Sequence, residues 1–132
     1  MGELSKSLQS GLVSLLHDTD GSLIIPKPFE REIFLFDTHV AGTSHIAGIE
    51  ELEPHLRIED ILDFFREPEN QYDKQAIAVK TAEGVKIGYV PKADNEIFAR
   101  LMDAGKLLFA KITHKEIKGT WVNIGIKVFL RD

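Results

Sequence analysis

The sequence predicts a mainly β domain, a small barrel of about six short strands with two short helices, preceded by a separate N-terminal helix. Three observations lead to this fold class. Short apolar runs rich in Ile, Val and Phe recur from residue 32 onward, as β-strands require. Gly, Pro and Asp residues separate these runs and provide turns. Only a few segments have apolar residues three and four positions apart, which is the spacing of an amphipathic helix.

The N-terminal segment reads as an appendage to the main domain. Its leucines line one face of an amphipathic helix: Leu4, Leu8, Leu12, Leu15 and Leu16. The helix is expected to end at the turn Asp18–Gly21, and Pro26 and Pro28 hold the following linker extended. We therefore divide the chain into residues 1–30, the helix and linker, and residues 31–132, the β domain. A homodimer formed through the helix is a further candidate assembly.

The β domain is expected to begin with a strand or a strand pair at Glu32–Phe36 and Thr38–Val40. A short helix or turn follows at Gly48–Leu56. Apolar runs predict the remaining strands at Ile61–Arg66, Ala76–Lys80, Val85–Val90, Lys106–His114 and Thr120–Phe129. The runs Ala76–Lys80 and Val85–Val90 are joined by a hairpin turn at Glu83 and Gly84.

The longer helix of the β domain is predicted from Ala93 to Ala104. Asp94 is placed to cap its N-terminus, and Gly105 is placed to end it. Its apolar face would consist of Ile97, Phe98, Leu101 and Met102.

The composition narrows the class of protein. The chain has 132 residues, 43% of them hydrophobic, which suits one domain with a packed core. It has no cysteine, so neither a disulfide nor a cysteine-based zinc site is available. No apolar run approaches the roughly 20 residues that span a bilayer, and the basic start of a signal peptide is missing. A cytoplasmic protein without a membrane anchor is expected.

The charge is unevenly distributed along the chain. The net charge of −5 argues against a protein that coats nucleic acid by bulk electrostatics. Residues 1–66 have 5 Lys and Arg residues against 12 Asp and Glu residues, whereas residues 67–132 have 11 against 9. A polyanion would therefore meet the second half of the chain.

One long string of residues resembles a known family. Residues Arg66–Val79 read Arg-Glu-Pro-Glu-Asn-Gln-Tyr-Asp-Lys-Gln-Ala-Ile-Ala-Val, and Ile87–Pro91 read Ile-Gly-Tyr-Val-Pro. Together with Val40–Thr43 and the helix after Pro91, this pattern closely resembles the HIRAN domain. The resemblance covers residues 34–130 and leaves the N-terminal segment unexplained.

The resemblance implies a barrel similar to the oligonucleotide-binding (OB) fold and a non-catalytic role without a cofactor. Members of the family occur alone in bacteria and attached to DNA-remodelling helicases, where the domain captures the free 3′ end of single-stranded DNA. DNA repair or processing is the implied setting. By position, Tyr72 would stack on a base, Asp73 would accept a hydrogen bond from the terminal 3′-hydroxyl, Asn70 would shape the pocket, and Lys92 would face a phosphate.

The chemistry of these residues agrees with that role. An aromatic face contributes about 1 to 3 kcal/mol of stacking per base, whatever the base. The carboxylate of Asp73 would repel a phosphate but accept a hydrogen bond from a hydroxyl, and so would favour a strand that ends at the site. Lys74 would add a phosphate contact that weakens as the salt concentration rises.

The sequence departs from the DNA-binding members of the family at Ser44 and His45. Those members have an Arg and a Tyr at these positions. His45 retains a smaller stacking face, but Ser44 lacks the charge of an Arg, which would bind a phosphate through a charge-assisted hydrogen bond. The affinity for DNA is expected to be lower, or the ligand to differ.

Two alternative functions remain open. The acidic first half of the chain, the altered Ser44 and His45, and the N-terminal helix suit a module that binds a protein partner. The site residues also have purely structural interpretations. Asn and Asp side chains often hold a turn by hydrogen bonds to nearby backbone groups, which would explain Asn70 and Asp73, and Tyr89 would pack on the sheet as a strand residue.

A metal-dependent nuclease is the weaker alternative. Its metal would be held by Glu67 and Asp73, joined by Glu69 or Glu83, but acidic loops are usually solvated turns. The five histidines form no H-E-x-x-H motif and no helical pair, so no metal site is expected.

Overall fold

The computed structural model describes residues 31–132. The predicted N-terminal helix, the Pro-containing linker and the dimer contact through that helix fall on residues 1–30, outside the described residues. Residues 31–132 form a compact unit by themselves.

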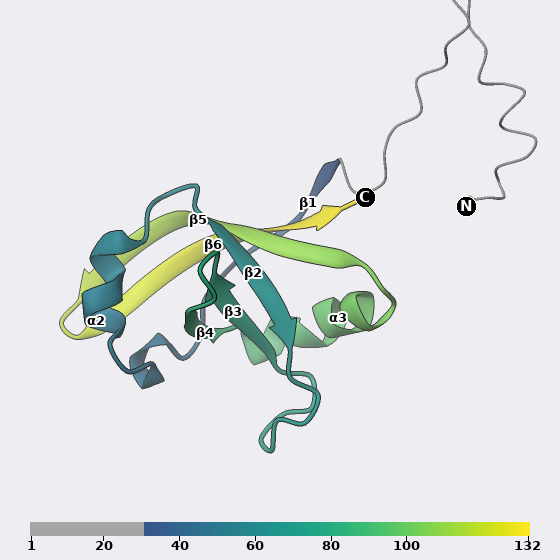
Figure 1. Cartoon of the computed structure of the whole chain (residues 1–132), viewed down its shortest axis with the longest axis horizontal. Helices are drawn as coiled ribbons and strands as arrows, with labels where there is room; N and C mark the ends of the chain where they lie inside the picture. Colours follow the sequence, from purple (N-terminus) through teal and green to yellow (C-terminus); the bar gives the residue numbers. More distant parts are fainter. Residues whose placement is uncertain (1–30) are drawn as a thin grey trace, which may run out of the picture. The chain divides into compact units, whose positions relative to one another are not determined.

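The described part of the chain is mainly β, as the sequence predicts. Six antiparallel strands form one sheet in the order β1-β6-β5-β2-β3-β4. They are β1 Glu32–His39, β2 Ile61–Arg66, β3 Ile77–Thr81, β4 Lys86–Tyr89, β5 Leu107–Lys118 and β6 Trp121–Arg131. Two helices accompany them, α2 Ile49–Leu52 and α3 Lys92–Asp103, with single 3₁₀ turns at Thr43–His45 (η1) and Glu53–His55 (η2). Figure 1 shows the strands curling into a half-barrel, with the β2–β3 loop projecting from it.

The two edges of the half-barrel meet where the chain leaves β1. The backbone N–H of Val40 still donates to the carbonyl of Ile124 in β6 at 2.9 Å, whereas Ala41 exchanges two hydrogen bonds with Tyr89 in β4 at 2.7 and 2.8 Å. Val40 and Ala41 therefore connect the β1–β6 side of the sheet to β4 at its other edge. A Cβ atom on Gly88 would lie 2.5 Å from the Ala41 carbonyl oxygen and 2.5 Å from Cγ1 of Val40. The close approach of these segments thus requires glycine at position 88.

The inner face of the sheet forms the core. Side chains alternate along each strand, so every second residue points inward. The largest fully buried side chains include Leu62, Ile77, Ile87, Ile112 and Ile124. Each such side chain contributes about 1.5 to 3 kcal/mol to folding when it leaves water. This core holds the strand ends from which the site residues project.

Helix α3 differs from the prediction in two respects. The helix begins at Lys92 with Pro91 at the N-cap. Asp94 is not a cap, because its Oδ2 accepts a hydrogen bond of 2.7 Å from Thr38 Oγ1 at the end of β1. Ile97 was expected on the apolar face, but it is 67% exposed, whereas Phe98 is buried. The first turn of the helix is thereby tied to β1 and lies next to the β2–β3 loop.

Candidate functional site

An open cleft of about 520 Å³ lies where three segments meet. The segments are Ala41–His45 after β1, Asn70–Ala76 in the β2–β3 loop, and Tyr89–Asn95 at the junction of β4 and α3. Closure of the barrel brings the first segment to the third, since Ala41 and Tyr89 are hydrogen-bonded to each other. The cleft is thus a product of the tertiary fold.

Arg66 fixes the base of the β2–β3 loop. Its Nη1 donates to the carbonyl oxygens of Lys74 and Ala76, both at 3.0 Å. Its Nε donates to Oδ1 of Asp103 at the end of α3, at 2.9 Å. One guanidinium therefore joins the loop to the C-terminal end of α3.

Asn70 sets the shape of the loop itself. Its Oδ1 accepts hydrogen bonds from the backbone N–H groups of Tyr72 at 2.8 Å and Asp73 at 3.1 Å. Its Nδ2 donates to Oε1 of Glu67 at 3.0 Å. These are the turn-holding bonds typical of asparagine. The turn directs the Asp73 carboxylate into the cleft, so the structural role of Asn70 also supports the binding role expected of its neighbours.

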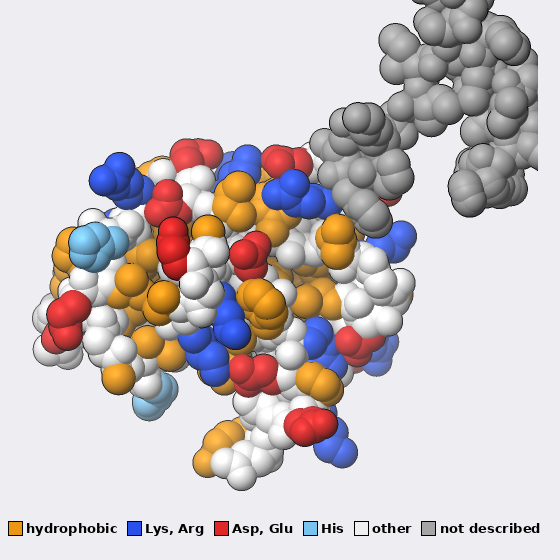
Figure 2. All heavy atoms as spheres, viewed as in Figure 1, with side chains coloured by type: hydrophobic (Ala, Val, Ile, Leu, Met, Phe, Trp, Pro, Cys, Tyr) orange, Lys and Arg blue, Asp and Glu red, His pale blue; other side chains and the backbone are white. Residues whose placement is uncertain are grey.

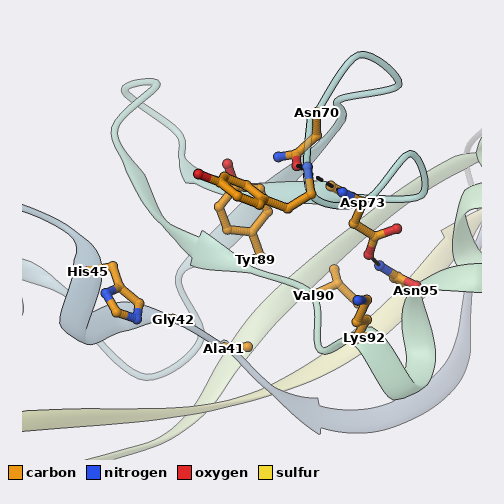
Figure 3. A pocket seen from close by; sticks show the side chains of 11 residues that line it. Ala41, Gly42, His45, Asn70, Asp73, Tyr89, Val90, Lys92 and Asn95 are labelled. Atoms are coloured by element: carbon orange, nitrogen blue, oxygen red, sulfur yellow. Dashed lines mark hydrogen bonds between the residues drawn. The ribbon is translucent and has the colours of Figure 1, made fainter.

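Asp73 is held from both sides. Its Oδ1 accepts a hydrogen bond from the backbone N–H of Gln75 at 2.9 Å, and its Oδ2 accepts one from Nδ2 of Asn95 at 2.8 Å (Figure 3). The Asn95 side chain and the Gln75 N–H lower the pKa of Asp73 below its ordinary value. The group is therefore ionised at neutral pH. A carboxylate has about four acceptor sites, so Asp73 can still accept a hydrogen bond from a ligand.

Asn95 was not predicted as a site residue. It lies in the first turn of α3, it is only 3% exposed, and it lines the cleft. A buried amide requires hydrogen-bond partners, and the ionised Asp73 determines that Nδ2 faces it. The available signal was a polar residue three positions after Lys92, on the same side of the helix.

Tyr89 packs at the end of β4, as expected, but it also lines the cleft. Its hydroxyl donates to Oε1 of Glu67 at 2.8 Å and accepts from Nζ of Lys86 at 2.9 Å. Burial favours a higher pKa for Glu67, but hydrogen bonds from Asn70, Tyr89 and Lys86 outweigh burial and lower that pKa below its ordinary value. The ring of Tyr89 is thus fixed by an ionised partner on one side and a cation on the other.

The cleft brings together five of the seven site residues predicted from the sequence: Asn70, Tyr72, Asp73, Lys92 and His45. Tyr72 is 83% exposed at the outer part of the loop, and Lys92 is the first residue of α3. Figure 3 shows His45 on the side of the cleft opposite Asp73 and Asn95. Ser44 and Lys74 are exposed and do not line this cleft. Lys74 instead lines a second hollow, which is formed by the loop residues 68–74.

Within residues 31–132, no group of three or more His, Asp or Glu side chains is arranged to hold a metal ion. Glu67, one of the carboxylates considered for a nuclease, forms an ion pair of 3.0 Å with Lys86. No helix in this part of the chain is both long enough and apolar enough to cross a bilayer.

Comparisons with known proteins identify the family of the chain and its fold. Residues 33–131 match the family model of the HIRAN domain. A crystal structure of a protein from Lactobacillus plantarum is 27% identical with a TM-score of 0.71, covering 76% of this chain and 95% of that one. The crystal structure of the HIRAN domain of human HLTF is 18% identical with a TM-score of 0.58, covering 76% and 81%.

A solution structure of the HLTF HIRAN domain is 16% identical with a TM-score of 0.52, covering 80% of this chain and 84% of that one. The search of curated proteins finds no match. The family model covers most of the chain, and the fold is shared with solved members. The chain therefore belongs to the HIRAN domain family, a family of DNA-binding modules.

Proposed function

We propose that the cleft binds the end of single-stranded DNA and selects a free 3′-hydroxyl. The observation that carries the proposal is the carboxylate of Asp73, which Asn95 and the Gln75 N–H hold in a cleft that Tyr72 and Tyr89 also line. An anionic group at the centre of a DNA site is costly unless it meets a hydrogen-bond donor. A terminal hydroxyl is such a donor, whereas an internal phosphodiester is not.

The remaining side chains suit the nucleotide next to that hydroxyl. Tyr72 and Tyr89 offer ring faces for bases, and each stacked base contributes about 1 to 3 kcal/mol. Lys92 lies at the N-terminus of α3, where its ammonium and the helix dipole both favour a phosphate. His45 provides a further, smaller face across the cleft. Lys74 lies outside the cleft, and its expected phosphate contact is with the strand beyond the terminal nucleotide.

The test compares strands that differ only at the 3′ end. Fluorescence anisotropy would measure the binding of a labelled strand of about ten nucleotides with a 3′-hydroxyl or a 3′-phosphate. Wild-type protein should prefer the hydroxyl, and Asp73→Asn should lose the preference while it keeps part of the affinity. Glu50→Gln, an exposed change on α2, is the control and should bind like the wild type. Equal binding of both ends by the wild type would refute end selection.

A further inference from the structure

The outward face of the sheet has an uncommon arrangement of rings and cations. On β1, β6 and β5, three phenylalanines form a row in which Phe34 meets Phe129 edge-on at 5.9 Å and Phe129 stacks on Phe109 at 5.4 Å. Each ring has a cation above it. Lys127 lies 5.4 Å from the centre of Phe34, Lys111 lies 5.1 Å from Phe129, and Arg131 lies 4.3 Å from Phe109.

The same arrangement continues on the other half of the sheet. Nζ of Lys80 on β3 lies 4.5 Å from the centre of Phe65 on β2, and Nζ of Lys86 lies 4.8 Å from the centre of Tyr89 on β4. Every strand thus contributes a ring or a cation to these pairs. Figure 2 shows Lys and Arg side chains next to hydrophobic ones over the strands in the middle of the view. We call this set of ring and cation pairs the outer track.

The strand register places the pairs on one face. Phe129 is opposite Phe34 on one side and Phe109 on the other, and Phe109 is opposite Asp63. Since directly opposed residues in an antiparallel sheet point the same way, the row crosses from β1 to β2. Phe65 and Tyr89 both pair with Ala78 and extend it to β4. Because Tyr89 also lines the cleft, the outer track begins at the candidate site.

The charges of the track are partly neutralised. Lys111 forms an ion pair with Glu32 at 3.2 Å, and Lys86 pairs with Glu67. Within residues 31–132, no carboxylate lies within ion-pair distance of Lys80, Lys127 or Arg131. Asp37 and Asp63 occupy the same face, opposite Lys127 and Lys80 in the register. The track is therefore suited to a few phosphate contacts and not to general coating of nucleic acid.

We propose that the outer track binds the single strand that leads to the cleft, and this inference rests on the proposed function. Five steps of about 4.8 Å between adjacent strands give a track of about 24 Å, enough for several nucleotides. The exposed rings are Phe34 and Phe65, 50% and 45% accessible, and they offer faces to bases. Arg131 covers the buried Phe109 ring, and the outer face of a guanidinium is itself a stacking surface for a base.

The experiment varies the length of the strand. The track variant Lys80→Gln/Lys127→Gln/Arg131→Gln removes three cations that have no carboxylate within ion-pair distance among residues 31–132. The matched control Arg57→Gln/Arg100→Gln/Lys106→Gln removes three exposed charges that make no contact with an aromatic ring. A labelled strand of about ten nucleotides tests cleft and track together, and an unlabelled strand of about three nucleotides, used as a competitor, tests the cleft alone.

The track variant should bind the long strand about tenfold more weakly than the control, with the short strand unaffected. Its plot of log affinity against log salt should be shallower by about 2, since each phosphate contact on a single strand contributes roughly 0.7. If the track variant instead binds the long strand like the control, the proposal is wrong. Wild-type dimers that the track variant abolishes, with no change in strand binding, would also overturn it and assign the face to a second copy.

Failure of the cleft and failure of the track give different results. If the wild type shows no preference for a 3′-hydroxyl, the proposal for Asp73 fails and the proposal for the track is unaffected. If the track variant binds the long strand like its control, the proposal for the track fails and the proposal for Asp73 is unaffected. Circular dichroism would first establish that each variant is folded. If the triple variant does not fold, Lys127→Gln and Lys127→Arg replace it, because only the first removes the charge. Weaker binding of the long strand by Lys127→Gln than by Lys127→Arg supports the track, and equal binding rejects it.

Discussion

Nδ2 of Asn95 donates a hydrogen bond of 2.8 Å to Oδ2 of Asp73, and this bond joins the first turn of α3 to the β2–β3 loop. The two residues come from segments that are 22 positions apart. Because Asn95 is buried and Asp73 borders the cleft, the bond anchors the Asp73 carboxylate to a residue that is packed in the fold.

Asn95→Ala should therefore weaken the site and the fold together. Loss of a hydrogen bond to a charged partner costs about 1.5 to 3 kcal/mol, and this loss would appear in the free energy of unfolding measured with urea. Discrimination between 3′-hydroxyl and 3′-phosphate strands should also decrease. Asn123→Ala, a half-buried asparagine in β6, is the control. An unchanged 3′-end preference in Asn95→Ala would show that Asp73 needs no partner on α3.

The free energy of unfolding should decrease in acid because folding lowers the pKa values of Asp73 and Glu67. The folded state lowers the pKa of Asp73 below 3.8 and the pKa of Glu67 below 4.5. A carboxyl group whose pKa is lowered by folding stabilises the protein fully above its unfolded pKa, and this stabilisation is lost as the pH falls through the folded pKa. We expect a constant free energy of unfolding from pH 7 to about pH 5 and a decline from about pH 5 to pH 3.

Urea denaturation at several pH values would measure this decline. Asp73→Asn should reduce stability at pH 7 and make the acid decline shallower, since the titrating group is gone. Asp73→Asn/Glu67→Gln should make it shallower still. A decline in the double variant as steep as in wild type would assign acid sensitivity to other carboxylates.

Gly88→Ala should destabilise the closure of the barrel. The added Cβ would meet the Ala41 carbonyl and the Val40 side chain at 2.5 Å, and overpacking of this kind costs about 1 to 3 kcal/mol or more. Thermal denaturation would measure the loss. Gly125→Ala is the comparison, because its Cβ would meet no backbone atom more closely than the side chains of the exposed His114, at 3.1 Å, and of Thr113, at 3.7 Å. The two variants should differ, with Gly88→Ala the less stable. Equal melting temperatures would contradict a tight closure at Ala41 and Tyr89.

Ser44→Arg/His45→Tyr should strengthen DNA binding. The variant adds a cation and a larger ring beside the cleft, and one charge-assisted hydrogen bond to a phosphate is worth about 1.5 to 3 kcal/mol. Anisotropy at several salt concentrations should show higher affinity and a salt dependence steeper by roughly 0.7. Ala47→Arg adds the same charge at an exposed position outside the cleft and should have a smaller effect. If both variants gain equally, the gain is due to net charge alone.

Much of the fold could be read from the sequence because its signals are local. The apolar run at Ile61–Arg66 became β2 with the predicted bounds, and Gly105, with a φ of 92°, ends α3 as expected. The lengths of β5 and β6 were underestimated, since β5 continues to Lys118 past an irregularity between Ile112 and His114. Pairing with β6 stabilises this polar extension of β5. The sequence of one strand does not show which strand it pairs with.

The resemblance to the HIRAN domain indicated five of the residues that line the cleft, with His45 among them. Asn70, Tyr72 and Asp73 lie in one loop, and Lys92 directly follows the string. Tyr89 and Asn95 line the same cleft, but a tyrosine in a strand and an asparagine in a helix have many uses. Only their positions opposite the loop distinguish them.

The sequence by itself determined the class of fold, the order of its elements and the loop that contains Asn70, Tyr72 and Asp73, because alternation, helical spacing and turn residues act over a few neighbouring positions. The tertiary structure alone decided the pairing of Ala41 with Tyr89, the bond from Asn95 to Asp73 and the rows of rings and cations across six strands. These relationships depend on strand register and barrel closure, which arise when distant segments bury their apolar faces in one shared core.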